Sequence, residues 1–99
     1  MYVEYNQVKI VISEILYIEG MKDYVKIFLI SSARPVITKM SLKSLEERLA
    51  GHRFVRIHKS HIISADKVTA IKRDLILIGN TELPLSEMYK QDVEAMLSL

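Results

Sequence analysis

The chain has 99 residues, of which 49% are hydrophobic and 26% charged, and its formal net charge is +2. This balance fits one globular domain and excludes a disordered chain. With no cysteine, disulfides and thiolate metal sites are excluded, and a cytoplasmic location is expected. No apolar run approaches the ~20 residues that cross a bilayer, so we expect no membrane partner. This net charge is too small to indicate nucleic-acid binding by itself, so the argument for such binding depends on where the basic residues lie.

The N-terminal part of the chain shows the alternation of apolar and polar residues that is typical of strands. Val25, Ile27 and Leu29, for example, share one face of a strand. The expected strands are residues 2–5, 8–12, 15–19, 24–30 and 36–40, with turns at Asn6-Gln7 and at residues 31–35.

The period then changes to that of a helix. Leu42, Leu45 and Leu49 recur at helical spacing, Ser41 can cap the first turn, and Gly51 can end the helix. We therefore predict one short central helix.

Residues 54–64 carry the strongest functional pattern in the chain. Val55 and Ile57 alternate with polar residues, which predicts a strand with one buried face. Polar donors fill four of the five positions at its end: Arg56, His58, Lys59 and Ser60. Such a cluster suits contact with phosphates and with base edges.

The C-terminal part predicts more short strands and a last helix. Residues 67–72 and 75–78 form a hairpin, Gly79-Asn80 is a turn signal, and Pro84 limits residues 82–85 to an edge or a loop. Ser86 is expected to cap the helix through its side chain; the apolar stripe of this helix is Tyr89, Val93, Met96 and Leu97. Strands outnumber helices and follow one another directly, so the fold class is mainly β with antiparallel sheets.

Metal binding and catalysis find little support in the sequence. The pair His58-x-x-His61 has no well-spaced third ligand, and residues three apart on a strand point to opposite faces. A Gly-x-Ser-x-Gly elbow is missing, and three glycines do not make a phosphate-binding loop. We therefore expect no metal site, no cofactor and no enzyme activity.

Four segments in order carry a family resemblance over nearly the whole chain: Ile15-Leu16-Tyr17-Ile18-Glu19-Gly20, Leu42-x-x-Leu45-Glu46-x-x-Leu49, Phe54-x-Arg56-x-His58-x-Ser60-x-Ile62-Ile63, and Leu83-Pro84-Leu85-Ser86 before Tyr89. With them the chain resembles the LytTR domain, the DNA-binding output domain of bacterial response regulators of the LytR/AlgR type.

The resemblance implies elongated antiparallel sheets, and loops and strand ends that enter successive major grooves of duplex DNA. Three regions are implied as the contact: 22–26, 56–60 and 86–90. Glu87 stands where the family often has arginine, so Met88 or Lys90 is expected to substitute for it. The expected DNA-binding residues are Lys22, Tyr24, Lys26, Arg56, His58, Lys59, Ser60, Glu87, Met88 and Lys90.

The function implied is transcriptional regulation as the output domain of a two-component response regulator. Residues 1–99 would be a single domain cut from a longer protein with an N-terminal receiver domain, and it would bind direct-repeat promoter sites, with a dimer forming on the DNA. The alternative from another class is a protein-interaction or small-ligand sensory module, with Tyr24, Phe28 and Tyr89 as interface anchors. RNA binding is a third reading, through Tyr24, Lys26 and Phe28 on one sheet face.

Overall fold

The computed structural model describes residues 1–3 and 8–97, so the predicted turn at Asn6-Gln7 lies outside the described residues. Within the described ranges the strands are β1 (Tyr2–Val3), β2 (Val8–Lys9), β3 (Ile15–Gly20), β4 (Val25–Leu29), β5 (Val36–Thr38), β6 (Phe54–His58), β7 (His61–Ser64), β8 (Ala70–Ile71), β9 (Leu75–Ile78) and β10 (Thr81–Pro84). The helices are α1 (Leu42–Arg48) and α2 (Lys90–Leu97), with 3-10 turns at Ile12–Glu14, Ala65–Lys67 and Glu87–Tyr89.

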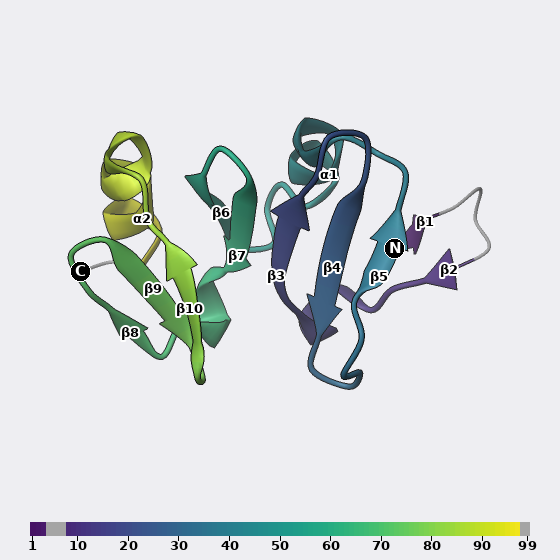
Figure 1. Cartoon of the computed structure of the whole chain (residues 1–99), viewed down its shortest axis with the longest axis horizontal. Helices are drawn as coiled ribbons and strands as arrows, with labels where there is room; N and C mark the ends of the chain where they lie inside the picture. Colours follow the sequence, from purple (N-terminus) through teal and green to yellow (C-terminus); the bar gives the residue numbers. More distant parts are fainter. Residues whose placement is uncertain (4–7, 98–99) are drawn as a thin grey trace.

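The strands form antiparallel sheets that lie along one long axis (Figure 1). The largest sheet has the order β5-β4-β3-β7-β6, a second has the order β10-β9-β8, and β1 pairs with β2. The molecule measures 38 × 24 × 23 Å. The predicted class, elongated antiparallel sheets with a short central helix and a C-terminal helix, is confirmed.

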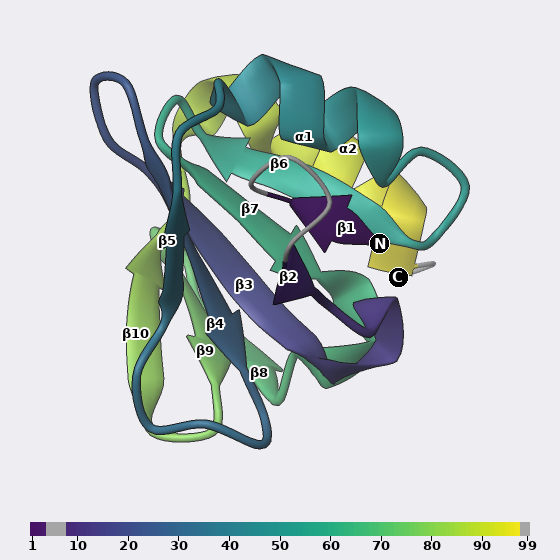
Figure 2. The same ribbon diagram turned by 90° about the vertical axis from the view of Figure 1, so that its right-hand side faces the viewer.

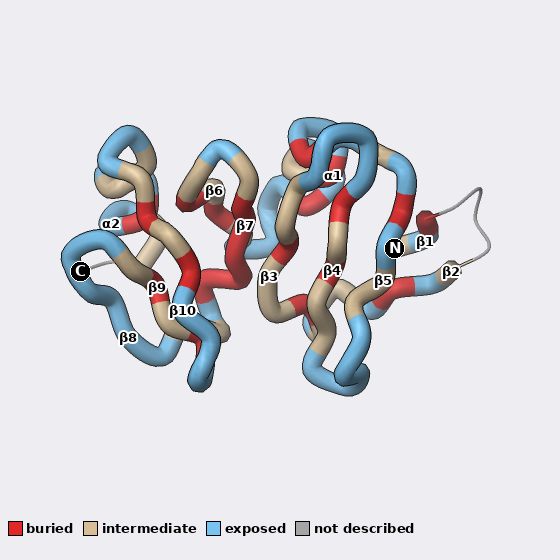
Figure 3. Tube along the Cα trace, viewed as in Figure 1, coloured by how far each residue is buried: buried red, intermediate tan, exposed pale blue. Residues whose placement is uncertain are grey.

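Two hydrophobic cores share strand β7. Ile62 packs with Ile18, Ile27 and Leu45 in a core between the large sheet and α1. The next residue, Ile63, points to the other face and packs in a second core built from β6, the small sheet and α2. Figure 3 shows β7 as a continuously buried stretch of the trace, whereas buried and half-buried residues alternate along β6. Each fully buried isoleucine or leucine stabilises the fold by about 1.5–3 kcal/mol.

Several local predictions are confirmed. The Ser41 hydroxyl oxygen accepts a hydrogen bond from the Ser44 backbone N–H at 3.0 Å and so caps α1. Gly51, just beyond that helix, has a φ of +85°, and Gly79 in the β9–β10 turn has a φ of +61°. Both angles lie in the left-handed region that glycine adopts without steric cost. Pro84 lies on β10, an edge strand, as its missing N–H requires.

Several predicted strands are shorter in the structure, and two of them lose more than half of their length. The strand expected at residues 8–12 ends at Lys9, and the 3-10 turn Ile12–Glu14 takes up its last residue. The strand expected at 67–72 is reduced to Ala70–Ile71, and its first residue belongs to the 3-10 turn Ala65–Lys67.

The predicted side-chain cap at Ser86 is wrong. The chain leaves β10 through the 3-10 turn Glu87–Tyr89 before α2 begins, and the Ser86 side chain makes no capping hydrogen bond. The Tyr89 N–H donates instead to the backbone C=O of Ser86 at 2.9 Å. This bond spans three residues, as in any 3-10 turn, and satisfies the donor that the hydroxyl was expected to bind.

Candidate nucleic-acid interface

The three predicted contact regions lie on one long edge of the molecule. β3 and β10 run toward this edge, and the β3–β4 loop, the β6–β7 turn and the segment before α2 all reach it, at the top of Figure 1. Viewed end-on, α1 and α2 also lie on this side, above β6 (Figure 2). The β4–β5 loop and the β9–β10 turn lie on the opposite edge.

Two backbone hydrogen bonds hold the outer regions to the central one. The Gly20 N–H donates to the Ser60 C=O at 2.7 Å, and the Ser86 N–H donates to the Ile57 C=O at 2.8 Å. A Cβ at Gly20 would lie 3.1 Å from Leu42 Cδ2, so the close approach of β3 to α1 favours glycine. The β6–β7 hairpin therefore fixes the positions of all three regions.

The Arg56 side chain folds back over the β6–β7 turn. Its Nε donates to the His58 C=O at 3.0 Å, its Nη2 donates to the Lys59 C=O, and its Nη1 lies 3.2 Å from Glu46 Oε1 of α1. A guanidinium has five N–H donors in a rigid fork, and here the fork binds the turn from below. Arg56 therefore supports the turn at whose tip the exposed Lys59 lies.

A chain of polar contacts runs beneath the same turn. His58 Nδ1 lies 2.9 Å from Ser60 Oγ, and Ser60 Oγ lies 3.0 Å from His61 Nδ1. His61 Nε2 lies 3.6 Å from Glu19 Oε2 of β3, and the Glu19 carboxylate lies 4.0 Å from Lys26 Nζ of β4. The contacts thus connect the central region to the first one.

His58 and His61 do not point to opposite faces of one strand, as predicted, because the chain reverses between them. The two residues pair across the β6–β7 hairpin, and their ring centroids lie 5.6 Å apart. Among the described residues, no group of three or more His, Cys, Asp or Glu side chains is arranged to hold a metal ion.

The first region presents basic and aromatic groups. The Met21 N–H donates to the Tyr24 C=O at 2.7 Å, which closes the β3–β4 loop. Lys22 is exposed at its tip, and 45% of Tyr24 is exposed. Within the described ranges neither Lys22 nor Lys59 forms an ion pair, so both charges are available to a partner.

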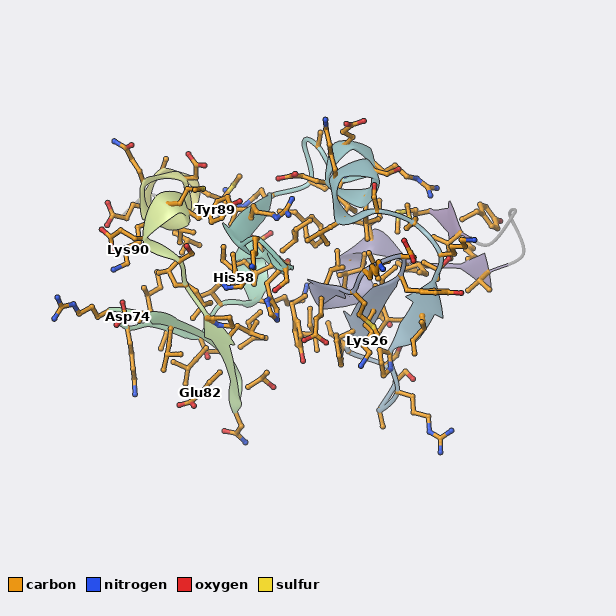
Figure 4. The ribbon with its side chains drawn as sticks, turned by 45° about the horizontal axis from the view of Figure 1, so that its top comes forward. Lys26, His58, Asp74, Glu82, Tyr89 and Lys90 are labelled. Carbon is orange, nitrogen blue, oxygen red and sulfur yellow. The ribbon has the colours of Figure 1, made fainter. Side chains whose placement is uncertain are left out.

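Acidic neighbours surround the basic group of the third region. Lys90 Nζ lies 2.9 Å from Glu87 Oε2. It also lies 3.5 Å from Oδ1 of Asp74, and Figure 4 labels both Lys90 and Asp74. The hydrogen bond with Glu87 raises the pKa of Lys90. Met88 next to them is 78% exposed. This end of the edge therefore offers an apolar side chain and a lysine whose charge is partly neutralised.

The aromatic residues named as interface anchors differ in exposure. Phe28 stacks on Tyr17 with ring centroids 4.3 Å apart, so the sheet covers part of its ring. Tyr89 is half-buried and lines a groove between α1 and α2 with Glu46 and Asp92. Tyr24 is the exposed member of the three.

Sequence reasoning missed three residues of this edge: Glu19, Glu46 and His61. Glu19 and Glu46 act on the β6–β7 turn from distant segments, and no local pattern signals such contacts. For His61 a signal exists, because the short turn makes His58 and His61 a cross-strand pair.

Comparison with known proteins agrees with this architecture. The LytTr DNA-binding domain family matches residues 5–98. A solved structure, the LytTr DNA-binding domain assigned to a methyl-accepting/DNA response regulator of Bacillus cereus, superposes with a TM-score of 0.80 at 22% sequence identity. The superposition covers 93% of this chain and 88% of that one. No curated protein matches the chain.

In the described part of the chain, no helix has the length and apolar character needed to cross a bilayer. The family match spans strands β2 to β10 and both helices, including the three regions of the edge. The chain therefore belongs to the LytTr family of DNA-binding domains.

Proposed function

We propose that this chain binds duplex DNA in a sequence-specific way through the edge that carries residues 22–26, 56–60 and 86–90. One observation carries the proposal: two backbone hydrogen bonds attach the outer regions to the β6–β7 hairpin, so that three separate loops form one surface. Loops held in this way contact DNA without a large ordering cost on binding.

The length of the molecule supports contact with more than one groove. Its long axis of 38 Å is close to one turn of B-DNA, which is about 34–36 Å. Loops at the two ends of such an edge can therefore reach successive major grooves on one side of a duplex. The central turn then lies over the backbone or the groove between them.

The roles of the basic residues follow from their partners. Lys59 and Lys22 are exposed and not ion-paired among the described residues, so we assign them direct contacts with bases or phosphates. His58 and Ser60 contribute hydrogen-bond donors beside Lys59. Arg56 is assigned mainly to holding the turn, because its three recorded contacts are internal.

The outer regions are assigned supporting roles. In the first, Tyr24 can pack against sugar or thymine methyl groups, and Lys26 adds positive charge beside it. In the third, Met88 is the exposed contact and Glu87 opposes phosphate unless it accepts a hydrogen bond from cytosine N4. Lys90 reaches DNA only if it leaves Glu87.

The biological role proposed is transcriptional regulation as the output domain of a two-component response regulator in the cytoplasm. Phosphorylation would act on a receiver domain N-terminal to this one in the full-length protein. Two copies on direct-repeat sites would double the contact surface and raise the affinity by the effective concentration of the second copy.

Selection of binding sites from random duplex DNA, followed by fluorescence anisotropy on the selected sequence, tests the proposal. If one copy neutralises roughly four to six phosphates, the plot of log K against log salt should have a slope of about −4 to −5. Enrichment of a direct repeat would support tandem binding.

The same measurements decide between the function classes. A salt slope near zero, with no enriched duplex, would favour the protein-interaction or sensory module. Equal affinity for single and double strands would favour RNA or single-strand binding. The matched control is Arg34→Ala, which removes one exposed charge from the β4–β5 loop on the opposite edge. It should leave both slope and selectivity nearly unchanged.

A further inference from the structure

Three side chains beneath the β6–β7 turn share hydrogen-bond contacts that only certain protonation states satisfy. The Ser60 backbone N–H donates to His58 Nδ1 at 3.2 Å, so this nitrogen carries no proton. The Ser60 hydroxyl lies 2.9 Å from the same nitrogen and must therefore donate to it. A serine hydroxyl has one hydrogen, so at the next contact, 3.0 Å away, the proton must come from His61 Nδ1.

The fourth contact needs one more proton. His61 Nε2 faces Glu19 Oε2 at 3.6 Å, and this contact is attractive only when Nε2 carries a hydrogen. A neutral His61 has a proton on one ring nitrogen, so it satisfies either Ser60 or Glu19 but not both. The imidazolium form of His61 has both ring protons and makes all four contacts at once.

The contacts also determine which atom of His58 faces a partner. Its Nδ1 is occupied, so in the neutral ring the proton lies on Nε2. Every buried side-chain nitrogen and oxygen in the described part of the chain has a hydrogen-bond partner, whereas His58 Nε2 has none. His58 Nε2 is therefore accessible to solvent, beside Lys59 on the proposed DNA-binding edge.

We propose that His61 is a positioning residue: by taking up one proton it completes the chain from Glu19 to His58 and fixes His58 Nε2–H as a donor to DNA. This inference rests on the proposed DNA-binding function. His61 itself touches no DNA, because it is buried below the turn with 9% of its surface exposed.

The groups that face His61 act in opposite directions on its pKa. Burial lowers the pKa of His61 below its usual value, the Glu19 carboxylate on β3 raises it, and His58 on β6 lowers it. Lys26 on β4 lies 4.0 Å from the Glu19 carboxylate and competes for it. The net direction is downward, so in the free protein the completed chain forms on the acidic side of the usual histidine range.

Bound DNA adds negative charge above the turn and so favours the imidazolium of His61. If the pKa of His61 is higher in the complex than in the free protein, binding takes up a proton. DNA affinity then rises as pH falls through the pKa of the complex, and it levels off below the pKa of the free protein. The coupling is limited to one proton per bound domain.

The first experiment uses the free protein. Ring ¹⁵N chemical shifts of the two histidines, followed from about pH 8 to about pH 5, report where each proton lies. We expect the neutral ring of His58 to carry its proton on Nε2, and His61 to change from one ring proton to two as the pH falls. A neutral His58 ring with its proton on Nδ1 would overturn the assignment.

The second experiment measures affinity for the selected duplex at constant ionic strength over the same pH range. The wild-type domain should bind about three- to tenfold tighter at the acidic end, the gain of one hydrogen bond. His61→Phe keeps a flat ring but has no nitrogen, so it should bind more weakly and lose most of the pH dependence. Glu19→Gln should move the rise in affinity to lower pH, because the carboxylate that favours the imidazolium is gone.

His52→Gln is the matched control, because His52 is exposed and takes no part in the hydrogen bonds that join His58, Ser60 and His61. Its pH profile should equal that of the wild type. A His61→Phe domain that keeps the wild-type pH dependence would overturn the proposal. If the wild-type domain binds no duplex at any pH, the proposed function is wrong, and so is the proposed role of His61 in DNA binding. The ring shifts of the free protein then still decide whether the hydrogen-bond chain exists.

Discussion

The backbone N–H of Gly20 donates to the backbone C=O of Ser60 across 2.7 Å, and this bond joins the end of β3 to the β6–β7 turn. The two residues are forty positions apart in sequence, yet each lies at the border of a predicted contact region. Because the bond uses only backbone atoms, the side chains of both loops can change without losing it. Gly20 also lies close to Leu42 of α1, and the first prediction tests this contact.

Gly20→Val should destabilise the fold by about 1–3 kcal/mol, because the added side chain collides with Leu42. The nearest atom, Leu42 Cδ2, lies 3.1 Å from the position of a Cβ at Gly20. Urea unfolding measures the loss. In a Leu42→Ala background the same substitution should cost much less, as a double-mutant cycle would show. An equal loss of stability in the wild-type and Leu42→Ala backgrounds would mean that the valine side chain does not collide with Leu42.

Lys59→Ala should lower both affinity and sequence discrimination, by about 1–3 kcal/mol if Lys59 contacts a base. Lys59 is exposed at the turn, so its removal should leave the thermal midpoint unchanged. The measurement is anisotropy with cognate and scrambled duplexes, with Arg34→Ala as the charge-matched control. An unchanged ratio between the two duplexes would limit Lys59 to phosphate contact.

Arg56→Ala should weaken binding through the shape of the turn, with a smaller change in selectivity. Hydrogen bonds to charged groups contribute about 1.5–3 kcal/mol each. Because 20% of the Arg56 side chain is exposed to solvent, the loss of stability in Arg56→Ala should lie near the lower value. Glu46→Gln keeps the fork in place and should have a smaller effect. Thermal melting and anisotropy together test this: a fully stable Arg56→Ala domain with weak binding would restore a direct contact with DNA.

Glu87→Arg should tighten DNA binding at low salt, and the gain should shrink as salt rises. The substitution removes a carboxylate from the edge and releases Lys90, which now lies 2.9 Å from it. Glu82→Arg makes the same charge change at the far end of β10, well away from Lys90 (Figure 4), and should have little effect. A weaker complex after Glu87→Arg would show that Glu87 makes a favourable contact, for example with cytosine N4.

The stability of the free domain should fall as pH decreases through the ordinary pKa of histidine. Burial lowers the pKa of His61, so the unfolded chain binds a proton more readily than the folded one. Stability from this group is complete above about pH 6.5 and is lost as pH falls toward the lowered value. Urea unfolding at several pH values measures the slope, which His61→Phe should reduce and His52→Gln should not.

Patterns within a segment were readable from the sequence. Val55 and Ile57 are buried as their alternation predicts. Leu42 and Leu45 of α1, with Leu49 at its C-cap, face one core. The Ser41 cap and the turn at Gly79 follow from residue types with a local preference. In each case the cause lies within a few residues of its effect.

Contacts between distant segments were not readable in this way. The pairing of Arg56 with Glu46 and of His61 with Glu19 depends on how helix and strands pack. The Ser86 cap failed because a 3-10 turn supplied a backbone carbonyl in place of the hydroxyl. The DNA-binding role of the edge remains a prediction, since basic side chains at a surface are compatible with several partners.

The strand order β5-β4-β3-β7-β6 has a kinetic consequence. Tyr17 pairs with Ile63, so the contact between β3 and β7 closes a long loop that contains β4, β5, α1 and β6. Closing a loop of this length carries an entropic cost that local hairpins such as β9–β10 avoid. We therefore expect the β9–β10 hairpin to form early and the β3–β7 seam to limit the rate of folding. Since that seam joins two of the three loops, competence to bind should appear only in the last step of refolding.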